Sequence, residues 1–165
     1  MRPPHATQPA GPHLAGAWLH ELHSHDIDEL ASSQPQWRLQ YEQLSAGRFA
    51  GAWRQLQLPG ARLVQERGSH ALRQHGTLDG TAVGFALAHG VGEGGFFHGQ
   101  RVPADALMVG RVDELDLTLP DAHQLIGLVV DATLLSDLWQ RLYGKPWSAW
   151  LDHQLVVPAR AGLAA

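Results

Sequence analysis

The feature that most constrains the fold is the strand-like rhythm of residues 38–131. Short segments of alternating apolar and polar residues follow one another, and Gly or Pro ends most of them. Leu115, Leu117 and Leu119, for example, alternate strictly with polar neighbours. At least eight such segments occur, at the spacing of about 8 to 12 residues that is typical of β-sandwiches and barrels. We therefore predict a mainly β fold with one barrel.

One of these segments, AVGFALA at residues 82–88, has two very different faces, because successive side chains of a strand point in opposite directions. Its bulky face carries Val83, Phe85 and Leu87. Its other face is nearly bare and carries Gly84, Ala86 and Ala88. We expect the bare face to leave space for a small molecule inside the barrel.

A second strand-like segment, RFAGAWRQLQL, changes its apolar parity along its length. Phe49, Gly51 and Trp53 share one face, whereas Leu56 and the leucine after it fall on the other. This change of parity predicts a β-bulge near residues 54–55.

The segments on either side of the barrel follow other patterns. Residues 1–22 contain Pro, Gly and His but no apolar core of a secretory signal, so we predict a disordered leader there. Residues 23–131 are expected to form the barrel, beginning with a short helix that Asp26 caps. Residues 132–165 are expected to form helices, because leucines recur at helical spacing between a possible cap at Asp131 and a stop at Gly144.

The composition excludes several classes of protein. The 165 residues, 44% hydrophobic and 17% charged, suit one globular domain, and no stretch reaches the roughly eighteen apolar residues of a membrane span. No cysteine is present, which favours a reducing, cytoplasmic location. The net charge of −4 and the scattered arginines argue against a nucleic-acid surface on this chain.

A metal site is the first alternative to consider, because His23, His25 and Glu29 have the HxHx3E spacing of the first cupin metal motif. The stretch lies at a predicted helix start, lacks the flanking glycines and is followed by no second metal motif, so we predict no metal there. His70, His75, His89 and His98 are better placed on strands but show no metal-ligand spacing. No GxSxG motif supports a serine hydrolase, and we name no catalytic residue.

One long stretch, DIDELASSQPQWRLQYEQLSAGRFAGAWRQLQLPGARLVQERGSHALRQHG, resembles the start of the amino-terminal, cupin-like sensor domain of AraC-family transcription regulators. The resemblance is greatest to regulators similar to those of ethanolamine and ornithine utilisation. The residues that carry it are Asp26, Asp28, Leu30, Ala31, Tyr41, Gln43, Leu44, Gly47, Phe49, Gly51 and the run from Ala71 to Gly76.

The resemblance implies a double-stranded β-helix, or jelly-roll, barrel followed by C-terminal α-helices. Such a domain binds a small effector, without a cofactor, and passes the signal through the helices to dimerisation and DNA contact. We expect these residues to hold the sensor part alone, without the helix-turn-helix domain that binds DNA in these regulators. We therefore expect a cytoplasmic, non-enzymatic effector-binding and dimerisation domain that forms a homodimer.

The residues named for ligand binding and dimerisation are chosen by the strand or helix face on which they lie and by the type of their side chains. The candidate ligand-binding residues are Trp53, Gln65, Arg67, Arg73, His75 and Phe85. An arginine inside the barrel would favour a carboxylate-bearing effector through a bidentate contact. Trp53 and Phe85 are equally expected in an ordinary hydrophobic core, and Arg67 and Arg73 are equally expected on a solvent-exposed strand face. The candidate dimerisation residues are Leu134, Leu135, Leu138, Trp139 and Leu142.

Two other functions stay open at this point. One is a small metal-dependent cupin enzyme, such as a dioxygenase or isomerase, which would bind a transition metal through the strand histidines. The other is an interaction module whose barrel is filled by side chains and binds no metabolite.

Overall fold

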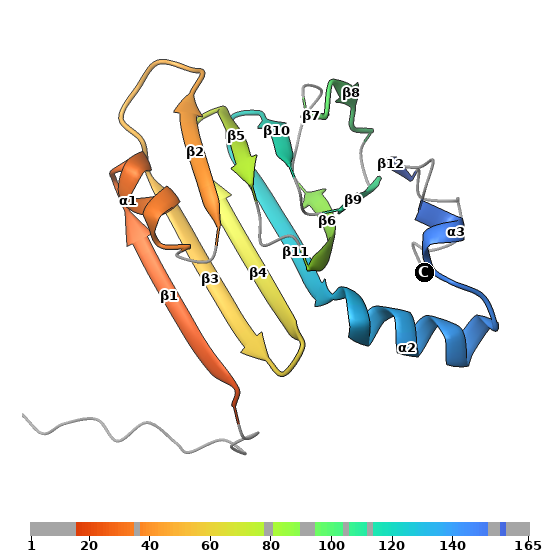
Figure 1. Ribbon diagram of the computed structural model, residues 1–165. Coiled ribbons are helices and arrows are strands. Elements are labelled where there is room, and N and C mark those ends of the chain that lie inside the picture. The colour runs from red at the N-terminus through yellow and green to blue at the C-terminus, as the bar shows by residue number, and fades with distance from the viewer. Residues whose placement is uncertain are drawn as a thin grey trace, which may run out of the picture.

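Two antiparallel β-sheets face each other and enclose most of the core (Figure 1). The structure is a computed structural model that describes residues 16–34, 37–77, 81–89, 95–103, 106–111, 114–151 and 156–157. The larger sheet contains, in spatial order, β1 (Trp18–Ser24), β3 (Gly51–Leu58), β4 (Ala61–Gly68), β11 (His123–Asp131), β6 (Ala82–His89), β9 (Leu107–Arg111) and β12 (Val156–Val157). The smaller sheet contains β2 (Arg38–Gln43), β5 (Leu72–Thr77), β10 (Leu115–Leu119), β7 (Phe96–Phe97) and β8 (Gln100–Arg101). The predicted mainly β fold is confirmed.

The strands β3 and β4 form a regular hairpin without the predicted bulge. Their pairing runs unbroken from Gly51 opposite Gly68 to Leu58 opposite Ala61. Trp53 points inward, whereas Leu56 pairs with Leu63 on the opposite face. The change of parity therefore reflects a sheet with apolar residues on both faces, and the prediction of a bulge was wrong.

Strand pairing decides which side chains of the larger sheet face the smaller sheet, a side we call the inner face. Val64 of β4 lies opposite Gly127 of β11, which lies opposite Ala86 of β6, which in turn lies opposite Met108 of β9. Directly opposed residues share a face. Gly84, Ala86 and Ala88 are therefore on the inner face, and Phe85 is on the outer one.

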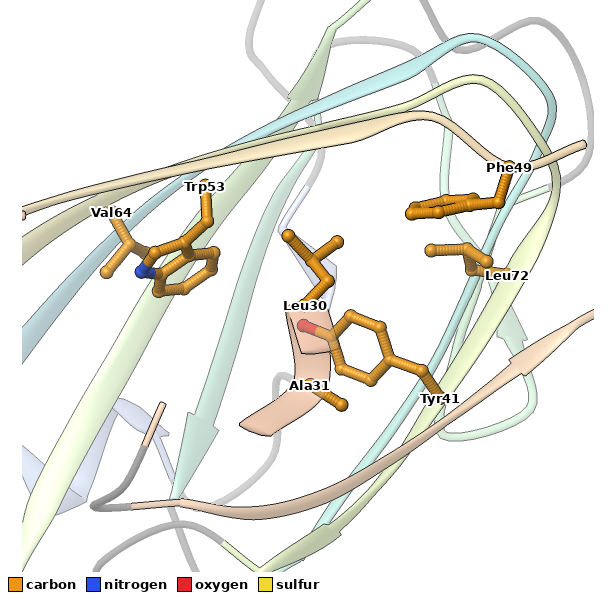
Figure 2. Close-up of a cluster of buried hydrophobic side chains, with 7 residues drawn as sticks. All are labelled: Leu30, Ala31, Tyr41, Phe49, Trp53, Val64 and Leu72. Carbon is orange, nitrogen blue, oxygen red and sulfur yellow. The ribbon is translucent and has the colours of Figure 1, made fainter. Parts of the chain in front are cut away.

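The core has parts on both faces of the larger sheet. Figure 2 shows one inner cluster, in which Trp53 and Val64 enter from the larger sheet, Tyr41 enters from β2, and Leu30 lies between them. A second inner cluster surrounds Phe97 and Leu117. The outer cluster consists of Val83, Val109, Val130, Leu135 and Trp147.

The N-terminal part differs from the prediction. Residues 18–22, which were expected to belong to a disordered leader, are part of strand β1, and β1 pairs along its whole length with β3. The helix α1 (Ile27–Ser32) follows directly after β1. Asp26 caps it as predicted, since its carboxylate accepts hydrogen bonds from the backbone N–H groups of Asp28 and Glu29.

The C-terminal part contains helix α2 (Ala132–Tyr143) and the short helix α3 (Ser148–Leu151), and then β12 returns to the sheet. Both predicted ends of α2 are confirmed. Asp131 accepts from the N–H groups of Thr133 and Leu134, and Gly144 ends the helix in the left-handed conformation, with φ 67°. None of the described helices is long and apolar enough to cross a membrane.

Replacing the cap of α2 tests how firmly the helix is joined to the barrel. We expect Asp131→Ala to lower the free energy of unfolding by about 1 kcal/mol, because two N–H groups lose their acceptor. Asp137→Ala, the same change at an exposed position of α2, serves as the control and should change stability by less than about 0.5 kcal/mol. Urea denaturation of both variants measures this, and equal losses would contradict the capping role.

Candidate functional site

A cavity of about 80 Å³ lies between the two sheets. This volume is several times the ~10–15 Å³ that one water molecule needs. Its wall on the larger sheet includes Gly84, Ala86, Gly110 and Gly127. A Cβ atom added to Gly84 would have only the carbonyl oxygen of Gly110 within 4 Å, at 3.9 Å. The bare face of β6 thus leaves the space that the sequence predicted.

Aromatic side chains form another part of the cavity wall. Trp53 of β3, Tyr41 of β2 and Trp37 all line it. The rings of Trp37 and Trp53 meet edge to face, with centroids 5.9 Å apart and an interplanar angle of 83°. This arrangement is a favourable one for aromatic pairs and gives the cavity a rigid apolar side.

A buried carboxylate, Glu66 of β4, is the main polar group of the cavity. Only 1% of Glu66 is exposed. Its Oε2 atom accepts a hydrogen bond of 2.7 Å from the hydroxyl of Tyr41, and its Oε1 atom accepts one from the side-chain amide of Gln74. Gln34 in turn donates to the Tyr41 oxygen at 2.8 Å. Because Tyr41 and Gln74 belong to the smaller sheet, Glu66 joins the two sheets across the cavity.

His123 of β11 approaches Glu66 from the other side. Its Nε2 atom lies 3.5 Å from Oε1 of Glu66, and the ring is fully buried. Its Nδ1 atom is 2.9 Å from the carbonyl oxygen of Pro120, so Nδ1 carries a proton. Gly68 makes room for the ring, since a Cβ atom there would lie 2.3 Å from His123.

The electrostatics of the site favour a neutral Tyr41. Burial raises the pKa of Tyr41 well above its usual value, and the negative charge and hydrogen bond of Glu66 raise it further. Tyr41 therefore keeps its proton and acts as a neutral donor to the carboxylate.

Several buried polar atoms of the cavity wall have no hydrogen-bond partner within the part of the chain that the structure describes. They are the amide oxygen of Gln34 and the indole nitrogens of Trp37 and Trp53. Buried polar groups are normally hydrogen-bonded. These atoms are thus available to a bound molecule or to water.

The predicted ligand-binding residues separate into two groups. Trp53 lines the cavity with its side chain. Phe85 also borders the cavity, but its ring packs against the outer cluster, so it contributes mainly backbone.

Gln65, Arg67, Arg73 and His75 do not line the cavity. Gln65 and Arg67 alternate with Glu66 and therefore point to the outer face. Arg73 pairs with Asp116 at the surface, with contacts of 3.0 and 3.2 Å, and this hydrogen-bonded pair lowers the pKa of Asp116. The arginines that led to the expectation of a carboxylate-bearing effector are outside the cavity.

Four residues of the site were not predicted from the sequence: Glu66, Gln74, Tyr41 and Gln34. A signal existed for Glu66, because it shares the alternation of Val64 and Gly68, which marks one face of β4. Gln34 lies between α1 and β2 and offered no comparable pattern.

The side chains of the HxHx3E motif are not gathered into one group of three. The His25 ring contacts the carbonyl oxygen of Phe49 at 3.2 Å, whereas Glu29 accepts a hydrogen bond from Ser24. Across the described ranges, no group of three or more His, Asp or Glu side chains is close enough to hold a metal ion. The side chain of His89, one of the four strand histidines, lies outside what the structure describes.

Comparison with known proteins finds a similar fold in a transcription regulator. No protein-family model matches the sequence. The structure is similar to the crystal structure of the AraC-like transcriptional activator CuxR, with a TM-score of 0.53 and 11% sequence identity. The match covers 76% of this chain and 52% of the CuxR chain, so it spans about half of that protein. At this identity the likeness shows a shared fold.

The network around Glu66 can be tested by removing one hydroxyl. Tyr41→Phe leaves a donor of Gln34 and an acceptor of Glu66 without their partner, and we expect it to lower the free energy of unfolding by about 1–3 kcal/mol. Tyr143→Phe is the matched control, because Tyr143 is 59% exposed and should change stability by less than about 0.5 kcal/mol. Chemical denaturation compares the two, and similar values would show that the Tyr41 hydroxyl has no special role.

Proposed function

We propose that this chain is the effector-binding and dimerisation domain of an AraC-like transcription regulator and has no catalytic activity. The observation that carries the proposal is the cavity between the sheets, which has largely apolar walls and a few buried polar groups, the usual make-up of a small-molecule site. The similarity in fold to CuxR supports the regulator class. The barrel would be of the cupin-like, jelly-roll type, and the protein cytoplasmic.

The position of the cavity offers a route for a signal. Leu125, Gly127 and Val129 of β11 line the cavity, and the same strand ends at Asp131, the cap of α2. A molecule between the sheets therefore contacts the strand that leads directly into the helix. It would act by binding one arrangement of barrel and helix more tightly than another. DNA contact would belong to a separate helix-turn-helix domain, in agreement with the net charge of −4.

Helix α2 supplies the proposed dimerisation surface. Leu135 is buried and Trp139 packs against the same outer cluster, so these two residues attach the helix to the barrel. Leu134, Leu138 and Leu142 are 36%, 44% and 71% exposed. Exposed leucines gathered on one helix mark a partner site, and a second copy of the chain is the partner we propose.

The double variant Leu138→Glu and Leu142→Glu tests the dimer. Charges at these positions would have to be buried without partners in a dimer, so we expect the monomer to predominate. Gln140→Glu, at another exposed position of α2, should leave the dimer intact. Light scattering coupled to size-exclusion chromatography measures the mass. A monomeric wild-type protein at high concentration, or a double variant that stays dimeric, would contradict the proposed surface.

Filling the cavity tests effector binding. We expect a metabolite library to contain a compound that, at about 100 times its Kd, stabilises the protein by about 2.7 kcal/mol and raises Tm by about 5–10 °C. Gly84→Leu should abolish this shift, because the new side chain enters the cavity. Gln65→Leu places a leucine on the outer face of β4 instead and should leave the shift unchanged.

Two results would count against the proposal. One is a library without any stabilising compound. The other is a compound whose effect survives Gly84→Leu and disappears with Gln65→Leu, which would place the site on the outer face.

A further inference from the structure

We propose that the outer face of the larger sheet is a docking surface for helix α2 of a second copy of this chain. The inference rests on the proposed function, since it names what the leucines of α2 contact in the dimer. The surface is a line of four leucines that crosses four neighbouring strands, and we call it the leucine row.

Strand pairing places the four leucines in one line. Leu19 of β1 lies opposite Leu56 of β3, and Leu56 lies opposite Leu63 of β4. Leu63 in turn lies opposite Leu128 of β11. Directly opposed residues share a face. Because Leu56 and Leu63 are on the outer face, the whole leucine row is on that face.

The leucine row is open to solvent over most of its length. Leu19, Leu63 and Leu128 are 60%, 44% and 40% exposed, and Leu56 is half-buried. Helix α1 packs with the inner cluster, and α2 leaves the end of β11 and extends away from β1 and β3 (Figure 1). A group of exposed apolar side chains on a sheet face marks an interaction site.

The covered end of the same line shows which partner fits it. Beyond Leu128 the line continues to Phe85 of β6 and then to Val109 of β9. Val109 is fully buried in the outer cluster, which also contains Leu135 of α2. Helix α2 therefore already packs on one end of this line within the chain, and the leucine row offers the same kind of side chain at the other end.

The exposed leucines of α2 form a surface of similar extent, which we call the α2 stripe. Leu134, Leu138 and Leu142 follow one another at intervals of four residues, so they extend over about 12 Å at the usual rise of a helix. The leucine row crosses four strands that lie about 4.8 Å apart and extends over about 14 Å. The two apolar surfaces therefore match in size.

The borders of both surfaces carry charges of both signs. Glu21 and Arg54, on the outer face beside the leucine row, form an ion pair of 2.7 Å. Asp137 and Arg141 border the α2 stripe, because each follows one of its leucines by three residues. An apolar centre with a polar rim is the usual make-up of a protein interface. Neither border has an excess of one sign that would keep two copies apart.

The size of the surfaces favours a second copy as the partner. A stable interface takes about 20–30 residues from each side. Helix α2 has 12 residues, of which Leu135 and Trp139 already hold it on its own barrel. A contact between two α2 helices alone is therefore small. In a two-fold dimer each copy lays its α2 stripe on the leucine row of the other, so both surfaces are buried twice.

The chain has no cysteine, which allows a site-specific cross-linking test. Chains with Leu63→Cys are mixed with isotope-labelled chains with Leu138→Cys, left to exchange, and treated with a short bis-maleimide. We expect mass spectrometry to show a covalent dimer of mixed mass, and little product from either variant alone. Glu42→Cys, at an exposed position of the smaller sheet, replaces Leu63→Cys in the control and should give no mixed product.

A second measurement places charge on the leucine row. Leu63→Lys combined with Leu128→Lys should raise the Kd of the dimer about tenfold or more, because the new charges would be buried without partners. Thr77→Lys, at an exposed position of β5, should leave this Kd unchanged. Analytical ultracentrifugation measures the Kd. Cooperative unfolding shows that the double variant is folded; if it is not, the cross-linking result decides.

The outcomes separate this inference from the proposed function. Leu138→Cys chains that cross-link only with each other would show that two α2 helices pack together. That result would overturn the role of the leucine row and leave α2 as the dimerisation helix. A lysine double variant that dimerises as the wild type does would also overturn the inference. A wild-type protein that stays monomeric would count against both.

Discussion

The hydrogen bonds to the buried carboxylate of Glu66 are the interaction on which the rest of the structure depends. It extends from β4 of the larger sheet and is held by Tyr41 and Gln74 of the smaller one. Few charged groups are buried in proteins, and those that are need partners. Here the partners come from the opposite sheet. The hydrogen bonds to Glu66 therefore fix how the two sheets face each other. The cavity is the space left beside this polar bridge, where the inner face of β6 contributes only Gly84 and Ala86 and β11 contributes Gly127 between two larger residues.

In the proposed function, the same bridge would connect ligand binding to the rest of the chain. Because Glu66 and the inner face of β11 border one cavity, a bound molecule would act on both the contact between the sheets and the strand that leads into α2. Helix α2 is attached at its start by its cap and through Leu135, while its later turns expose leucines. A small shift of β11 would therefore change the position of an apolar surface suited to a second subunit.

Much of the fold could be predicted from local patterns. The alternation of apolar residues located the strands, and Asp26, Asp131 and Gly144 marked helix ends because caps are local interactions. The site could not be predicted in the same way. Alternation divides a strand into two faces but does not say which is inside, so Arg67 and Arg73 were chosen although their neighbours Glu66 and Gln74 face the cavity. The burial of Glu66 depends on its hydrogen bond from Tyr41, which is 25 residues earlier in the chain.

The most direct test of the account follows the indole N–H groups by NMR during titration with a compound that raises the Tm of the wild-type protein. Trp37 and Trp53 line the cavity, whereas Trp18 on β1 is 49% exposed and serves as an internal reference. Single Trp→Phe variants assign the three resonances. The account predicts that the Trp37 and Trp53 resonances shift with a common Kd and that the Trp18 resonance does not move. Movement of Trp18 alone, or no movement of Trp37 and Trp53 at a saturating concentration of that compound, would contradict it.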